Sequence, residues 1–102
     1  NRKSWLANAL KPVGSIYLDL GACNAIQKKG ASLLLVGIKK IEGNFCANQP
    51  VKILNPYNQE IARGISSFSS EQISTELEKQ LSSYKYPVVI HRDVLVLTGS
   101  LK

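Results

Sequence analysis

The sequence predicts a small, mainly β domain of the α+β class, folded as a closed or half-closed barrel of about six short strands. Two observations predict this class. Apolar and polar residues alternate over short segments that are separated by Gly, Pro and Asn turns. Only two segments carry helix end signals, one after the first strand and one before the last two strands. Because short strands with open edges pair with other chains, closure of the sheet is expected.

The first strand is predicted over residues 14–20, where apolar side chains alternate with polar ones. Asp19 is suited to cap a helix over residues 20–29, because its carboxylate can accept hydrogen bonds from the free amides of the first turn. Gly30 follows the helix where a left-handed glycine is typical. The face of this helix that we expect to be buried consists of Ala22, Ala25 and Ile26.

The remaining strands are predicted over residues 37–45, 51–54, 60–65, 88–90 and 94–97. Ser69 and Gln72 have the spacing of a capping box, in which each residue satisfies the backbone amide of the other. A second helix is therefore predicted from this box to about Leu81.

The 102 residues fit one domain, which we place at residues 14–98. Residues 1–13 are predicted to be a tether from an upstream domain, and residues 99–102 a C-terminal tail. Since the sequence contains no methionine, we expect the chain to be a piece of a longer protein. The apolar run at residues 33–38 is too short to span a bilayer, and no signal peptide is visible, so no membrane partner is expected.

The net charge of +6 lies entirely within residues 1–59, because the two signs balance in the rest of the chain. This asymmetry indicates an anionic partner such as RNA, although a merely solubilising charge is an equal alternative. No aromatic residue lies between the lysines, so stacking of single-stranded bases is not supported. The predicted anion or RNA patch consists of Lys28, Lys29, Gly30, Ser32, Lys39 and Lys40.

No motif for phosphate, dinucleotide or metal binding is present, so we predict no catalytic, cofactor-binding or metal-ligating residue. His91 and Asp93 could belong to a catalytic set, but a turn with local salt bridges is the favoured interpretation. Cys23 and Cys46 are interpreted as free thiols of a cytosolic protein, with a disulfide left open.

The segment Gly-Ser-Ile-Tyr-Leu-Asp-Leu-Gly-Ala at residues 14–22, followed by Gly30 and the Ser-Leu-Leu at residues 32–34, resembles the PUA domain. More closely, the order of these motifs with Arg-Lys-Ser-Trp-Leu at residues 2–6 and His-Arg-Asp at residues 91–93 is similar to the C-terminal PUA domains of bacterial glutamate 5-kinases. The sequence departs from that family at Leu35, Asn48 and Phe68, and residues 70–86 are shorter than usual.

The resemblance implies a PUA-like pseudo-barrel without catalytic residues, attached to an upstream amino-acid-kinase domain. The parent enzyme would be a cytoplasmic, homo-oligomeric kinase that phosphorylates the γ-carboxylate of glutamate with ATP and magnesium, the first step of proline biosynthesis. The domain itself would hold no cofactor and would regulate or organise the enzyme. The alternative that the PUA fold implies is an RNA-binding module.

Overall fold

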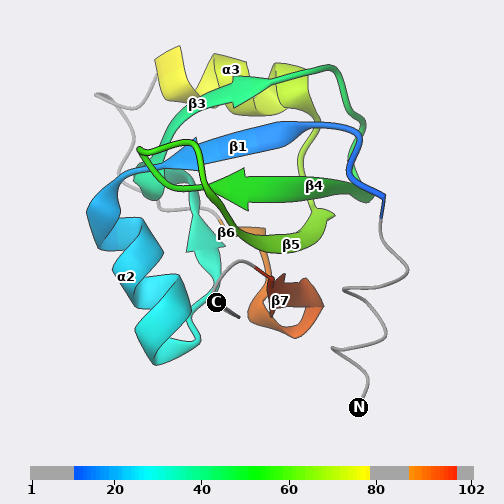
Figure 1. The fold of residues 1–102 in the computed structure, drawn as a ribbon. Helices are drawn as coiled ribbons and strands as arrows, with labels where there is room; N and C mark the ends of the chain where they lie inside the picture. Colours follow the sequence, from blue (N-terminus) through cyan, green and yellow to red (C-terminus); the bar gives the residue numbers. More distant parts are fainter. Residues whose placement is uncertain (1–10, 79–87, 99–102) are drawn as a thin grey trace.

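The computed structural model describes residues 11–78 and 88–98, which form two sheets and two α-helices (Figure 1). A five-stranded sheet has the order β3-β1-β4-β5-β7, and β2 pairs with β6 in a second sheet. The strands are β1 (Ser15–Leu18), β2 (Leu33–Leu34), β3 (Ile38–Glu42), β4 (Gln49–Leu54), β5 (Glu60–Ser66), β6 (Val88–Ile90) and β7 (Leu95–Leu97). The helices are α2 (Leu20–Lys29) and α3 (Ser70–Glu78), and the 3₁₀ turns are η1 (Leu35–Gly37) and η3 (Arg92–Val94).

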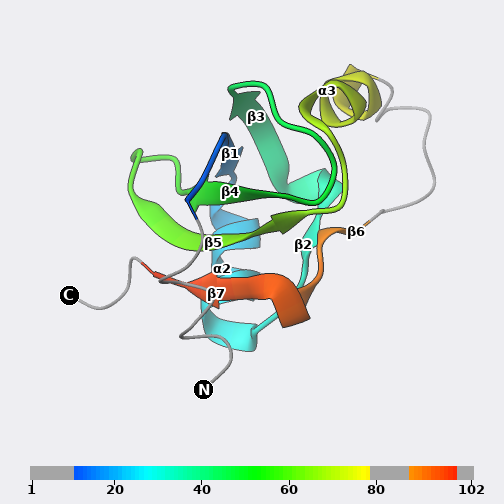
Figure 2. The ribbon, with the colours of Figure 1, turned by 90° about the vertical axis from the view of Figure 1, so that its right-hand side faces the viewer.

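The larger sheet curves around one apolar core, with α2 and α3 at two of its ends (Figure 2). β1 pairs antiparallel with β3 and parallel with β4, and the other pairs are antiparallel. The curved sheet with its small second sheet confirms the predicted α+β barrel-like class. Side chains from both sheets and from both helices meet in the core, and the fully buried ones include Ile16, Leu18, Ile26, Leu33, Ile53, Ile73 and Ile90.

Helix α2 begins and ends at the predicted residues. The carboxylate of Asp19 accepts a hydrogen bond of 2.7 Å from the amide of Ala22, which is the predicted N-cap. Gly30 adopts the left-handed conformation at φ 63°, and its amide donates to the carbonyl of Ala25. Because both end signals act locally, they could be recognised without knowledge of the tertiary structure.

The buried face of α2 differs in part from the predicted one. Ile26 is buried as expected, but Cys23 is also buried, whereas Ala22 and Ala25 are only half-buried. The reason is a shallow groove of about 340 Å³ beside the helix, which is lined by both alanines and by residues of β2 and η1. Cys23 and the exposed Cys46 are both free thiols, so the disulfide left open by the sequence does not form.

The second helix starts with the predicted capping box. The amide of Ser69 donates to Oε1 of Gln72 at 2.8 Å, and the amide of Gln72 donates to Oγ of Ser69 at 3.1 Å. Helix α3 is described up to Glu78, so its predicted end near Leu81 lies outside the described residues. Most of the predicted tether at residues 1–13 and the whole tail at residues 99–102 lie outside them too.

The predicted strands are in place, but their ends shift and one strand was missed. β1 is shorter than residues 14–20 because Asp19 leaves the sheet to cap α2. β4 begins at Gln49 rather than at residue 51, directly after Asn48 turns the chain at φ 70°. β2 was not predicted, because two residues are too short to show an alternating pattern and only their pairing with β6 makes them a strand.

Helix α2 packs closely against η1 at Gly37, where a Cβ atom would lie 2.5 Å from Cβ of Ala22. We therefore expect Gly37→Ala to destabilise the domain by about 1–3 kcal/mol through overpacking, measured as the free energy of unfolding in urea. Gly21→Ala is the matched control, since its Cβ would meet only an oxygen of Asp19 at 3.5 Å. That variant should be neutral or stabilising by up to about 1 kcal/mol. Equal destabilisation by both changes would contradict close packing at Gly37.

Candidate functional site

The structure divides the six residues of the predicted anion patch into two groups. The chain enters α2 beside the start of β3, where the amide of Asp19 donates to the carbonyl of Gly37 at 3.0 Å. Lys28 and Lys29 lie in the last turn of the same helix. A helix rises about 1.5 Å per residue, so roughly 13–15 Å separate these lysines from the end of α2 that adjoins β3. Both views show β3, which carries Lys39 and Lys40, away from the C-terminal end of the helix, where Lys28 and Lys29 lie (Figures 1 and 2).

The far end of α2 instead meets a segment distant in sequence. The amide of Arg92 donates to Oγ of Ser32 at 2.8 Å, which fixes the loop after α2 against η3. Lys28, Lys29, Gly30, His91 and Arg92 are all exposed there. We call this surface the basic end, and define it as Lys28, Lys29, Gly30, Ser32, His91 and Arg92.

The predicted turn at residues 91–93 is confirmed. Nδ1 of His91 accepts from the amide of Asp93 at 3.1 Å and lies 3.4 Å from its carboxylate. What the sequence analysis missed is that the backbone of this turn lies against the loop that follows Lys28 and Lys29. No local signal could have shown this, because Ser32 and Arg92 are 60 residues apart.

Lys39 and Lys40 are exposed on β3 in different surroundings. Nζ of Lys40 lies 4.6 Å from the ring centroid of Tyr17, within the range of a cation–π contact. The hydroxyl of Tyr17 in turn donates to Oε1 of Glu42 at 2.9 Å, and this hydrogen bond raises the pKa of Tyr17. Lys40 is therefore part of a mixed cluster on the outer face of the sheet.

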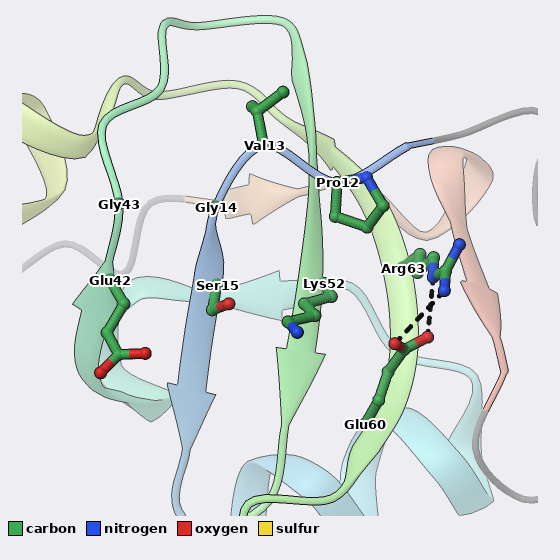
Figure 3. Close-up of a pocket in the computed structure, with 9 residues that line it drawn as sticks. All are labelled: Pro12, Val13, Gly14, Ser15, Glu42, Gly43, Lys52, Glu60 and Arg63. Atoms are coloured by element: carbon green, nitrogen blue, oxygen red, sulfur yellow. Dashed lines mark hydrogen bonds and ion pairs between the residues drawn. The ribbon is translucent and has the colours of Figure 1, made fainter.

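The same face carries a cleft of about 450 Å³, which we call the polar cleft (Figure 3). Its floor is a row of side chains brought together by strand register, in which Glu42 is paired with Ser15, Ser15 with Lys52 and Lys52 with Arg63. The cleft is lined by Pro12, Val13, Gly14, Ser15, Glu42, Gly43, Lys52, Glu60 and Arg63. The sequence analysis did not predict it, because four strands contribute to it and only their order sets the row.

One end of the polar cleft is closed by an ion pair. Oε2 of Glu60 lies 2.8 Å from Nε of Arg63 and accepts a hydrogen bond of 2.5 Å from the hydroxyl of Thr98. Burial alone would raise the pKa of Glu60, but the hydrogen bonds from Arg63 and Thr98 and the charges of Arg63 and Lys52 outweigh it. The pKa of this carboxyl therefore lies below its ordinary value of 4.5.

Within residues 11–78 and 88–98, no three His, Cys, Asp or Glu side chains come together as metal ligands would. Over the same residues, neither helix has the length and apolar character needed to cross a bilayer. The fold is that of a small pseudo-barrel module. It combines a strongly curved mixed sheet, one helix after β1 and a second small sheet, and it carries polar regions on its surface.

The profile of the PUA domain matches residues 14–83, which is more than half of the chain. The chain therefore belongs to the PUA domain family. Solved structures show the same fold. A PUA domain protein from Aeropyrum pernix K1, in a tartrate complex, superposes with a TM-score of 0.69 at 22% identity over 78% of this chain and 41% of that one. A chain of the archaeal box H/ACA sRNP Nop10-Cbf5 complex superposes with a TM-score of 0.62 at 16% identity over 85% of this chain and 24% of that one.

Similar curated proteins are glutamate 5-kinases. The one from Prochlorococcus marinus strain MIT 9313 is 61% identical over 98% of this chain and 28% of its own length. The one from Synechococcus sp. strain CC9605 is 47% identical over 95% of this chain and 27% of its own length. The chain thus spans little more than a quarter of the relatives that it matches.

The lowered pKa of Glu60 predicts a pH-dependent contribution to stability. The ionised carboxylate is favoured in the folded state, so its stabilisation is present above the ordinary pKa and is lost as the pH falls through the folded-state pKa. Glu60→Gln should therefore lower the free energy of unfolding by about 0.5–1 kcal/mol at pH 7. The difference in free energy of unfolding between this variant and the unaltered chain should shrink towards pH 3.

Urea unfolding at the two pH values measures this difference. The matched control is Glu78→Gln, which removes an exposed carboxylate that forms no ion pair within the described residues. We expect it to change stability by less than about 0.5 kcal/mol at either pH. A Glu60→Gln difference that stays constant between pH 7 and pH 3 would contradict the role given to the Glu60 carboxylate.

Proposed function

We propose that this chain is the non-catalytic C-terminal PUA domain of a glutamate 5-kinase. The main support is identity of 47–61% to such enzymes over almost the whole chain, although it spans only about 28% of their length. A match of this extent to one part of an enzyme fits a module attached to a larger catalytic chain. The charged groups of the basic end and of the polar cleft lie at the surface, where a partner domain can reach them.

The parent enzyme would transfer the γ-phosphate of ATP, with magnesium, to the side-chain carboxylate of L-glutamate, giving L-glutamyl 5-phosphate for proline biosynthesis. ATP, magnesium and the catalytic groups would be held by an amino-acid-kinase domain upstream of Asn1. We place this enzyme in the cytoplasm as a homo-oligomer. The PUA domain would act on that enzyme as a regulatory or architectural part, with residues 1–13 as the tether.

The first test separates catalysis from regulation. The 102-residue chain should form no ADP from ATP in the presence of glutamate. The complete enzyme, by contrast, should still form ADP after deletion of residues 14–98. A regulatory role predicts that the deletion changes KM or the response to effectors, and an architectural role predicts a change in oligomer mass by light scattering. Glutamate-dependent ADP formation by the 102-residue chain alone, or loss of all activity on deletion, would contradict the proposal.

RNA binding is the second candidate, and the observation that favours it is the basic end. There Lys28, Lys29 and Arg92 present three cations beside the exposed loop at Gly30. Exposed cations suit contacts to phosphates, which supply most of the salt-dependent affinity of proteins for nucleic acids. The groups contacted at that surface would be backbone phosphates rather than stacked bases.

The structure supplies a matched pair of variants for the RNA test. Changing Lys28 and Lys29 to Ser removes two cations of the basic end, and changing Lys39 and Lys40 to Ser removes two from β3. If RNA binds at the basic end, the first change should reduce the log–log salt slope of binding by about 1.4–1.8, since each phosphate contact contributes roughly 0.7–0.9. The second change should leave the slope nearly unaltered.

Binding to a structured RNA would be followed by fluorescence anisotropy over a series of salt concentrations. If the two double variants reduced the salt slope equally, the four lysines would act together, as the sequence analysis expected, and not as two groups. A dissociation constant of only about 10⁻⁴–10⁻⁶ M for every RNA at physiological salt is typical of non-specific contact. That outcome would reject the RNA-binding function.

A further inference from the structure

We propose that the polar cleft binds a small zwitterion, namely a free α-amino acid, between Lys52 and Glu42. This inference goes beyond the proposed function, because it requires neither a kinase domain nor RNA. It rests on the row of side chains across β3, β1 and β4, where a cation and an anion stand on either side of a hydroxyl (Figure 3).

The positive pole of the cleft is Lys52. Its side chain is half-buried at the floor, and it forms no ion pair or hydrogen bond with any described residue. Beside it is Ser15, which is 8% exposed and whose hydroxyl also forms no hydrogen bond within the described chain. Every fully buried side-chain oxygen of the described residues has a hydrogen-bond partner. The Ser15 hydroxyl has none, so it is not fully buried and is open to the cleft that Ser15 lines. An ammonium beside a free hydroxyl is a suitable receptor for a carboxylate.

The negative pole is Glu42, on the other side of Ser15. Its Oε1 accepts the hydrogen bond from Tyr17, which holds the carboxylate in place and leaves Oε2 available. No cation forms an ion pair with Glu42 within the described residues. A carboxylate fixed in this way can accept hydrogen bonds from the ammonium group of a ligand.

The spacing of the strands that carry the two poles leaves room for an α-amino acid between the side chains. Neighbouring strands lie about 4.8 Å apart, so β3 and β4, which flank β1, are separated by about 9–10 Å. The ammonium nitrogen and the carboxylate oxygens of an α-amino acid are about 3 Å apart. With a charge-assisted hydrogen bond of about 2.8 Å at each end, the ligand and its contacts span about 9 Å.

The other charged pair of the cleft does not compete for the ligand. Glu60 is held by Arg63 and Thr98, and the charge of Lys52 acts on it without forming an ion pair. The ammonium group of Lys52 therefore has no direct partner among the described residues. The opening of the cleft is formed by Pro12, Val13, Gly14 and Gly43, which carry no charge. Val13 is 46% exposed and offers an apolar wall to the side chain of the amino acid.

The experiment titrates the 102-residue chain with glycine and L-alanine by calorimetry and by ¹⁵N-detected NMR. We expect a dissociation constant on the order of 1 mM, with amide shifts concentrated at Gly14, Ser15 and Gly43. Acetate and methylammonium each carry one pole only, and 6-aminohexanoate carries both poles too far apart. These three probes should bind at least about tenfold more weakly, because each loses one charge-assisted contact.

Variants test the two poles separately, with folding checked by circular dichroism. Lys52→Gln and Glu42→Gln should each weaken glycine binding about tenfold or more, and Ser15→Ala about threefold. Lys39→Gln is the matched control, since it removes an exposed lysine that does not line the cleft, and it should leave binding within about twofold.

Three outcomes would overturn the proposal. The first is that the folded, unaltered chain binds neither glycine nor L-alanine at ligand concentrations 10-fold above the expected dissociation constant. The second is acetate or methylammonium binding as tightly as glycine, which would define a simple ion site. The third is a set of amide shifts at the basic end rather than around the polar cleft.

Discussion

The structure depends on the alternation of side chains along β1, a strand of four residues in the middle of the domain. Ile16 and Leu18 point into the core and are fully buried, whereas Ser15 and Tyr17 lie on the outer face. Because β1 pairs with both β3 and β4, this alternation sets which side chains of those strands enter the core. A shift of register by one residue would bury Tyr17 and expose Ile16.

The same strand determines where α2 lies. Asp19 follows β1 directly, and its amide donates to the carbonyl of Gly37 while its carboxylate caps the helix. The helix is thereby fixed at its first turn, with Ala22 against Gly37. The last turn, with Lys28 and Lys29, lies at the other end of the helix, and the loop after it meets η3 through Ser32. Two neighbouring groups of lysines in sequence thus become two separate surfaces.

The two polar surfaces differ in their electrostatics. The basic end has three permanent cations with Asp93 as the nearby acid of η3, so it favours an extended anion. The polar cleft has both signs in an ordered row, so it favours a short ligand that carries both charges. The cleft contributes nothing to the net charge of +6, because its two cations and two carboxylates cancel.

The sequence by itself determined the features that depend on near neighbours in the chain. Asp19, Gly30 and the Ser69–Gln72 box define helix ends because their hydrogen bonds reach only a few residues, and the resemblance that identified the PUA family is likewise carried by local motifs. The tertiary structure alone decided which surfaces form. β2 exists only through its pairing with β6, Arg92 joins Ser32 across 60 residues, and the row of Glu42, Ser15 and Lys52 results from strand order. These contacts are set by how strands pair and pack, which no short stretch of sequence records.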